Sequence, residues 1–137
     1  MGFHAEVKVR FSDVDNAGIV YYPRFFHFFH VAFEEMFSSK FGIHYVDVIN
    51  VEKLGFPAVH AESDFKAPLR YGDIADVEIS LGRLGEKSVT FDYRLVRQPA
   101  NELCATGKVT VAMIAMEGFR SIPVPEKYQK LFRSIGH

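Results

Sequence analysis

A strongly apolar segment follows a carboxylate-bearing loop near the start of the chain. Of the thirteen residues from Phe25 to Phe37, nine are apolar and six of these are Phe. A surface helix usually shows only a narrower apolar stripe, so a helix of this kind must be covered by other structure. The preceding loop, Ser12 to Gly18, contains two aspartates. Because a helix start carries unpaired N–H groups and the positive end of a dipole, we expect the chemistry of the chain at this junction.

Length and charge restrict the class of protein. The 137 residues fit one domain, 1–137, and the net charge of -1 provides no global field for nucleic acid or an anionic membrane. No apolar run approaches the roughly 18 residues that a membrane span requires. The single cysteine, Cys104, cannot form an internal disulfide, and the first residues lack a secretory signal pattern. We therefore expect a cytoplasmic protein without nucleic-acid or membrane partners.

Periodicity predicts one long helix and several strands. Alternating apolar residues predict a strand over 3–11, and the helix is expected from about Tyr22 to Lys40, with Gly42 as a left-handed stop. Residues 43–56 are expected to form a loop with a short helix near 46–51. The rest of the chain predicts strands at 57–66, 73–84, 87–97 and 103–115, a short strand at 118–122, and an amphipathic tail at 125–134.

These elements predict an α+β fold. The short connections favour antiparallel neighbours, so five to six strands form a curled antiparallel sheet wrapped around one long central helix. Curled sheets leave edges and a back face that associate readily. We therefore expect a homo-oligomer.

The two loop aspartates allow two interpretations. Paired carboxylates in a loop are commonly turn formers or caps. However, Asp15 is followed by small residues up to Gly18, which let a ligand approach the backbone, and then by the helix start. Asp15 could attack a carbonyl as a nucleophile or act as a base on water, while a backbone N–H holds the developing oxyanion. Because Pro23 has no N–H, the amide of Tyr22 is the expected donor.

The run from Val9 to Phe25 resembles the sequence signature of the 4-hydroxybenzoyl-CoA thioesterase family of hotdog-fold enzymes. The resemblance implies a catalytic carboxylate at Asp15 and a polarising backbone N–H at Tyr22. It also places Gly18, Val20 and Tyr21 beside the substrate. Members of this family are homotetramers or dimers with sites between subunits, and they need no metal or cofactor.

The resemblance favours an aromatic acyl group. The step from Tyr21 to Pro23 resembles the 4-hydroxybenzoyl enzyme, although that enzyme has an acidic residue where His30 aligns. His30, Ala32 and Glu34, together with the run 57–61, instead resemble the 1,4-dihydroxy-2-naphthoyl-CoA thioesterases. Many bacterial relatives that act on short acyl-CoAs carry a His at the position of Tyr22, so a short-chain aliphatic substrate is the alternative.

Several polar residues are further substrate-binding candidates. At 100° per residue, His27, His30 and Glu34 form a narrow polar stripe that could contact the ligand or a subunit interface, or simply be hydrogen-bonded within the fold. A metal site there would lack a fourth ligand, and none is expected. By resemblance, His60 could line the acyl pocket, or it could be a solvated strand residue. Lys87 and Ser88 could contact CoA phosphates by the same resemblance, or form a solvated hairpin.

The sequence therefore predicts an acyl-CoA thioesterase that hydrolyses an aromatic thioester to a free acid and CoA. Two rivals remain open. One is a ligand-binding module that uses the same Phe-lined cavity without turnover, although such a binder would not need a carboxylate beside the helix start. The other is a hotdog dehydratase, which would use His27 or His30 as an acid or base.

Overall fold

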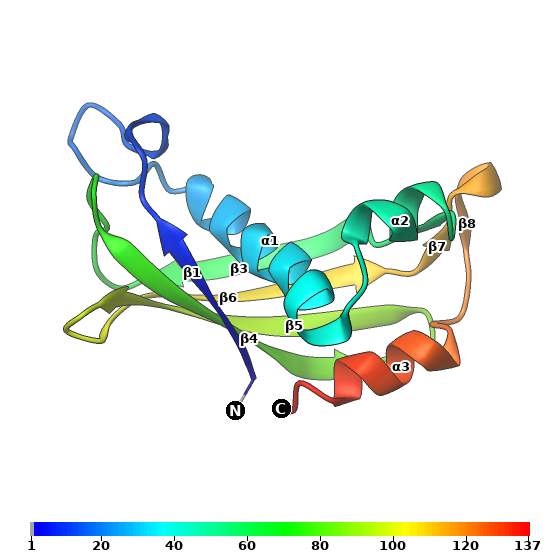
Figure 1. Ribbon diagram of the computed structural model, residues 1–137. Coiled ribbons are helices and arrows are strands. Elements are labelled where there is room, and N and C mark those ends of the chain that lie inside the picture. The colour runs from blue at the N-terminus through cyan, green and yellow to red at the C-terminus, as the bar shows by residue number, and fades with distance from the viewer. Residues whose placement is uncertain (1) are drawn as a thin grey trace.

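The computed structural model describes residues 2–137, and it consists of a five-stranded antiparallel sheet with one long helix on its inner face (Figure 1). The strand order is β1-β4-β5-β6-β3, so β1 and β3 are the two edges. The strands of this sheet are β1 (Phe3–Lys8), β3 (Ala58–Phe65), β4 (Ile74–Leu84), β5 (Ser88–Gln98) and β6 (Glu102–Ala112). The helices are α1 (Arg24–Met36), α2 (Tyr45–Asn50) and α3 (Glu126–Arg133).

The α+β arrangement predicted from the sequence is confirmed, and the differences lie at the ends of elements. The first strand ends at Lys8 rather than residue 11, because Phe11–Asp13 turns as a short 3-10 helix in which the Asp13 carboxylate accepts the Arg10 N–H. Helix α1 continues as a π-helical turn, Phe37–Phe41, and stops at Gly42 with φ 70°, as expected for a left-handed stop.

A second, smaller sheet was not predicted. It is made of three two-residue strands, β2 (Leu54–Gly55), β7 (Ile114–Ala115) and β8 (Arg120–Ser121), in the order β2-β7-β8. The strand expected over 103–115 is consequently divided into β6 and β7. The predicted short helix near 46–51 and the short strand within 118–122 are confirmed as α2 and β8, and the amphipathic tail forms α3.

The core lies between α1 and the inner face of the sheet. Phe28, Phe29 and Phe33 of α1 are almost fully buried, as are the alternate residues of β4 and β5 that face them. Helix α3 covers the far end of this core, where the Phe132 ring contacts Phe37 with centroids 6.2 Å apart. Within the described residues, no helix is both long enough and apolar enough to span a bilayer.

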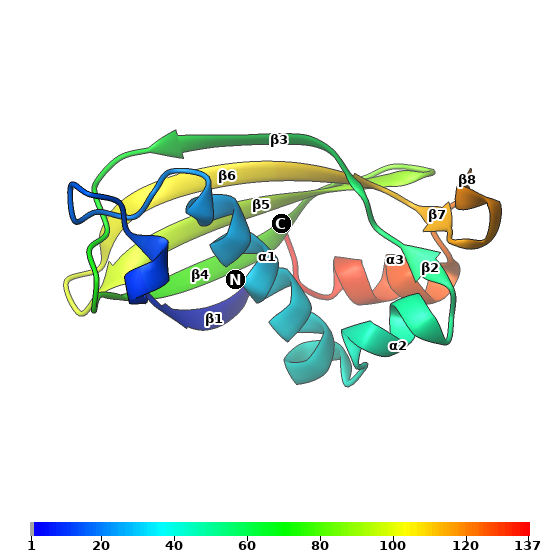
Figure 2. The same cartoon turned by 90° about the horizontal axis from the view of Figure 1, so that it is seen from above.

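The sheet does not wrap the helix completely in a single chain. Helix α1 packs on β1 and β4, whereas His27, His30 and Glu34 are exposed. Figure 2 shows α1 displaced towards the β1 side of the sheet, with β3 on the opposite side. The expected covering thus holds for most apolar residues of the helix, whereas its polar stripe stays exposed, with His27 towards β1 and His30 towards β3.

Candidate functional site

Asp13, the first loop aspartate, anchors the loop to the helix. Its side chain is buried, and Oδ1 accepts hydrogen bonds from Nε and Nη2 of Arg24 at 2.9 and 2.6 Å. The other oxygen, Oδ2, accepts the Arg10 N–H, and the Asp13 carbonyl accepts the N–H of Tyr21. These bonds join the end of the first strand, the loop and the first residue of α1. Asp13 thus has the structural role that loop carboxylates commonly have.

Asp15, two residues later, is solvent-exposed. Its Oδ1 accepts the N–H of Ala17 at 2.8 Å, which closes a tight turn, and its carbonyl accepts the N–H of Gly18. Gly18 has φ +79°, a conformation that favours glycine. Val14 and Val20 pair across the base of the loop, so the loop forms a small hairpin with Asp15 near its tip. The second carboxylate oxygen, Oδ2, has no hydrogen-bond partner among residues 2–137.

The Tyr22 amide lies at the entrance to α1. The neighbouring amides are used: Tyr21 donates to Asp13, and Arg24 donates to the Tyr21 carbonyl. Pro23 has no N–H, and the Tyr22 N–H has no acceptor among residues 2–137. A backbone N–H without a partner at a helix start is a donor available to a ligand oxygen.

Two apolar cavities lie beside α1, and Tyr22 lines the first of them. Tyr22 and Phe25 line a first cavity of about 340 Å³ with Val20 and Phe65. Phe65 belongs to β3, and its ring lies 6.2 Å from that of Tyr22 and 5.1 Å from that of Phe25. Tyr21 is exposed, with its ring 5.3 Å from the Tyr22 ring. The predicted substrate contacts Gly18, Val20 and Tyr21 thus lie next to Tyr22 or on the loop that precedes it.

A second cavity of about 350 Å³ lies further along α1, between the helix and strands β3, β5 and β6. We call it the acyl cavity. Its lining is apolar apart from His30 and Tyr93, and His30 Nε2 pairs with Glu34 at 2.8 Å. The Tyr45 ring contacts the His30 ring, and burial, with a smaller effect of Glu34, raises the pKa of Tyr45 to about 12. An aromatic ring would fit this space better than a charged group.

The remaining predicted site residues do not meet Asp15 within one chain. His60 pairs with Glu62 at 2.9 Å, and these residues alternate with Ala61, which lines the acyl cavity. His60 therefore lies on the outer face of β3 in this chain. Lys87 and Ser88 lie at the β4–β5 hairpin, where Ser88 pairs with Ala112, whereas the Asp15 loop contacts Leu69 and Arg70 at the other end of the sheet.

Other candidate chemistry is limited. Cys104 is fully buried, and burial raises the pKa of its thiol, so it behaves as a small core residue. Within residues 2–137, no group of three or more His, Cys, Asp or Glu side chains is placed to hold a metal ion. His27 lies near the β1 side of α1, in a polar hollow with Arg24, whereas His30 lines the acyl cavity.

Two residues of this site were not predicted from the sequence. Arg24 fixes the aspartate loop, and it could have been found from its place in the first helical turn. The positive end of the helix dipole does not favour a cation there, so an arginine at this position suggests a carboxylate partner. Tyr93 was not detectable, because a tyrosine in an alternating strand is normally a core residue. Its place at the acyl cavity follows only from the structure.

The chain is similar to known proteins over nearly its whole length. Residues 9–132 match the family model described as the thioesterase-like superfamily. A 1,4-dihydroxy-2-naphthoyl-CoA hydrolase of Synechocystis is 28% identical over 135 residues, which are 98% of this chain and 97% of that protein.

Two solved structures of relatives show the same fold. That of a 1,4-dihydroxy-2-naphthoyl-CoA thioesterase from Synechocystis has a TM-score of 0.87 with 28% identity and covers 98% of each chain. That of a gentisyl-coenzyme A thioesterase has a TM-score of 0.82 with 28% identity and covers 92% of this chain and 98% of that one. The fold is the hotdog fold, as the sequence predicted. The chain belongs to the thioesterase-like superfamily.

Proposed function

We propose that the protein hydrolyses the thioester of an aromatic acyl-CoA to the free acid and CoA. The observation that carries this proposal is the unpaired amide of Tyr22, a residue that lines an apolar cavity and follows a loop with an exposed carboxylate, Asp15. Membership in a thioesterase superfamily supports this reaction class. The relatives named above act on dihydroxynaphthoyl-CoA and gentisyl-CoA, which supports an aromatic acyl group.

The proposed chemistry takes place between Asp15 and Tyr22. The Tyr22 N–H donates a hydrogen bond to the thioester carbonyl oxygen and stabilises the negative charge that develops on it. Asp15 either attacks the carbonyl carbon, displacing the CoA thiolate to leave an acyl anhydride that water hydrolyses, or removes a proton from a water that attacks directly. Both routes give the same products and need the same exposed carboxylate oxygen. We propose that both occur without a metal or cofactor.

We further propose that the site is completed by a second copy of the chain. All residues of β3 except Ser63 are exposed, and Val59 and Phe65 leave large apolar surfaces in solvent. An edge strand with unpaired backbone groups pairs readily with another copy. Antiparallel pairing of two β3 strands would extend the sheet across both chains and bring a second copy beside the acyl cavity, which Ala58 and Ala61 of β3 line.

This pairing also explains why the predicted CoA contacts lie far from Asp15 in one chain. The hairpin with Lys87 lies at the Ala58 end of β3, and Tyr22 lies at the Phe65 end. In an antiparallel dimer, the Ala58 end of one strand lies beside the Phe65 end of the other. Lys87 of the partner subunit would then approach the entrance to this chain's site, where a phosphate of CoA could bind it. A dimer is thus the smallest active unit that we propose, and two dimers could form a tetramer.

A thiol-release assay tests the proposed reaction. Purified protein is mixed with benzoyl-CoA, hydroxynaphthoyl-CoA and a short aliphatic acyl-CoA, and free CoA thiol is measured. We expect turnover of the aromatic thioesters, with the aliphatic substrate at least about tenfold slower in kcat/KM, because it buries less apolar surface in the acyl cavity. Binding without release of thiol would instead show a ligand-binding module. Faster turnover of the aliphatic substrate would contradict the aromatic preference.

A further inference from the structure

We propose that the hydroxyl group of Tyr93 recognises a polar substituent on the acyl group, at the end of the ring remote from the thioester. Tyr93 would then be a specificity-determining residue, and its preferred ligand would be a hydroxylated aromatic acid. This inference rests on the proposed binding of an aromatic acyl group in the acyl cavity.

The Tyr93 hydroxyl group has no hydrogen-bond partner in the part of the chain that the structure describes. The residue is only 4% exposed, and it lies on the inner face of β5, where Phe91 and Leu95 on either side are fully buried. No hydrogen bond joins the hydroxyl to any other group of residues 2–137. In that part of the chain, every side-chain oxygen or nitrogen that is sealed from solvent has a hydrogen-bond partner. Because the Tyr93 oxygen has none, it must border open space. Buried polar groups normally have a partner, which points to a ligand or water in the cavity.

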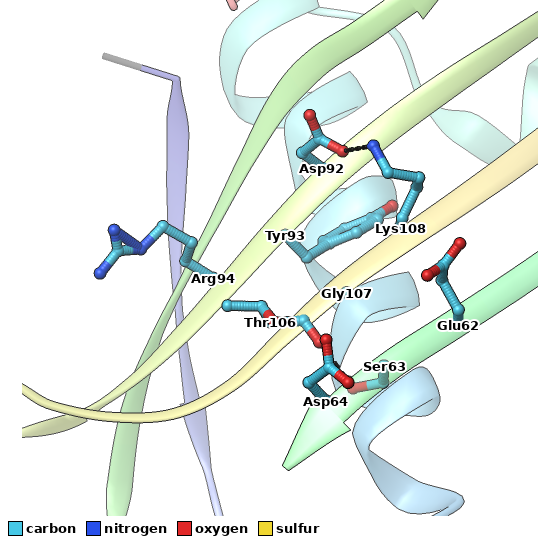
Figure 3. Close-up of a pocket in the computed structure, with 9 residues that line it drawn as sticks. All are labelled: Glu62, Ser63, Asp64, Asp92, Tyr93, Arg94, Thr106, Gly107 and Lys108. Atoms are coloured by element: carbon cyan, nitrogen blue, oxygen red, sulfur yellow. Dashed lines mark hydrogen bonds and ion pairs between the residues drawn. The ribbon is translucent and has the colours of Figure 1, made fainter. Parts of the chain in front are cut away.

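The ring of Tyr93 is held in place. It stacks on Phe29 with centroids 4.8 Å apart and an interplanar angle of 21°. On the next strand, Tyr93 faces Gly107 (Figure 3). A Cβ atom at position 107 would lie 2.3 Å from the Phe29 ring, so only glycine leaves room for this arrangement. A fixed hydroxyl can select a ligand because little freedom is lost on binding.

Tyr93 provides the free polar group of the cavity lining. The other polar side chain there, His30, is engaged by Glu34. Burial raises the pKa of Tyr93, with a smaller effect of Tyr45, so the phenol keeps its proton at neutral pH and can donate or accept a hydrogen bond. A purely hydrocarbon ring would leave this hydroxyl unpaired, and sites built around such a group reject ligands without a matching partner.

The position along the helix indicates which end of the ring is read. Phe29, on which Tyr93 stacks, lies five residues after Arg24, or about 7.5 Å along the axis. The thioester carbonyl is proposed to lie at the Tyr22 amide, before the helix begins. A substituent that reaches Tyr93 therefore has to be at the far end of the acyl ring.

The test compares Tyr93→Phe with the wild type on a matched pair of substrates. These are 6-hydroxy-2-naphthoyl-CoA, which carries a remote hydroxyl group, and 2-naphthoyl-CoA, which does not. For the wild type, we expect a higher kcat/KM with the hydroxylated substrate. In Tyr93→Phe this preference should fall about tenfold, which is the size of one lost hydrogen bond, because the hydroxylated substrate loses its partner and 2-naphthoyl-CoA no longer leaves a hydroxyl unpaired.

Tyr128→Phe is the matched control. Tyr128 is also a buried tyrosine, but its hydroxyl donates to Glu52 outside the cavity. We expect this variant to be less stable while the preference between the two substrates is retained. An equal effect of Tyr93→Phe on both substrates, or no effect on either, would overturn the proposal, because it would indicate a packing role only.

A binding measurement separates this inference from the proposed reaction. Calorimetric titration with 6-hydroxy-2-naphthoate and 2-naphthoate does not depend on hydrolysis. If the wild type hydrolyses neither thioester, the proposed function fails, yet tighter binding of the hydroxylated acid that is lost in Tyr93→Phe would still support the role of Tyr93. Equal binding of the two acids by the wild type, or binding of neither, would overturn it.

Discussion

The two edges of the main sheet differ in how much of their structure one chain completes. Strand β1 alternates between exposed and buried residues, and Ala5 and Val7 are covered because α1 packs against it. Strand β3 is exposed along almost its entire length, including Phe65, which is 47% exposed. Tyr22 and the acyl cavity lie on this open side. The β1 side is thus covered within one chain, whereas the β3 side is the one that we propose to become functional against a second copy.

The strongest test of this difference is a charge placed in β3. Ala61 lies near the middle of the strand, so Ala61→Asp would bring two carboxylates close together across the twofold axis of an antiparallel dimer. We expect dimer affinity to fall about a thousandfold, because like charges in an interface cost several kcal/mol. Light scattering should then give the 15.6 kDa mass of one chain. Lys8→Asp on β1 is the control and should leave the oligomer intact, and an oligomeric Ala61→Asp would contradict the proposed interface.

On the β1 side, Asp13 should matter for folding. Asp13→Asn leaves Arg24 without its buried carboxylate. We expect the free energy of unfolding to fall by about 3 kcal/mol. This value is at the low end for a broken buried ion pair because Arg24 is partly exposed. Denaturant titration measures this change. Asp15→Asn is the matched comparison two residues away, and its stability should be unchanged because asparagine can form the same turn. Equal destabilisation by both variants would show that the two aspartates share one role.

The wall of the acyl cavity should be sensitive to a single methyl group. Gly107→Ala would force Phe29 and the stacked Tyr93 to move. We expect a loss of about 2 kcal/mol in the free energy of unfolding, as for overpacking in other cores. Thermal unfolding provides the measurement. Gly85→Ala at the β4–β5 hairpin is the comparison, because a Cβ atom there would lie 3.1 Å from its nearest neighbour, the Ser88 hydroxyl oxygen. An unchanged midpoint for Gly107→Ala would mean that the Phe29–Tyr93 stack is not rigid.

The last stability effect is an alkaline loss linked to Tyr45, which appears only above pH 10. The folded protein keeps the Tyr45 proton up to a pKa of about 12, whereas the unfolded chain releases it near 10.0. The contribution of Tyr45 to the free energy of unfolding should therefore be constant below pH 10. Between pH 10 and 12 it should fall by at most about 1.4 kcal/mol per pH unit. Tyr45→Phe should flatten this fall in denaturant titrations at pH 9 to 12. An unaltered slope would contradict the assigned burial of the Tyr45 phenol.

The same two sides explain what could be predicted from the sequence. Alternation in β4 and β5, the Phe-rich helix and Gly42 were sufficient for the main architecture, because periodicity records burial within the chain. The pairs of residues that make β2, β7 and β8 are too short to show a period. The different roles of Asp13 and Asp15 depend on Arg24, eleven residues beyond Asp13, and a single sequence does not identify that partner. Lys87 could be matched to a role by resemblance but not placed near Asp15, because the proposed contact requires a second chain.

The central claim is that Asp15 performs the hydrolysis beside the Tyr22 amide. It is tested most directly by the rate of thiol release from hydroxynaphthoyl-CoA by wild type and Asp15→Asn, at saturating substrate and with the oligomeric mass checked. We predict a loss of about 10³ to 10⁴ in kcat with an unchanged midpoint of thermal unfolding, because the exposed carboxylate contributes to the chemistry and little to the fold. Turnover of Asp15→Asn at the wild-type rate would contradict the account.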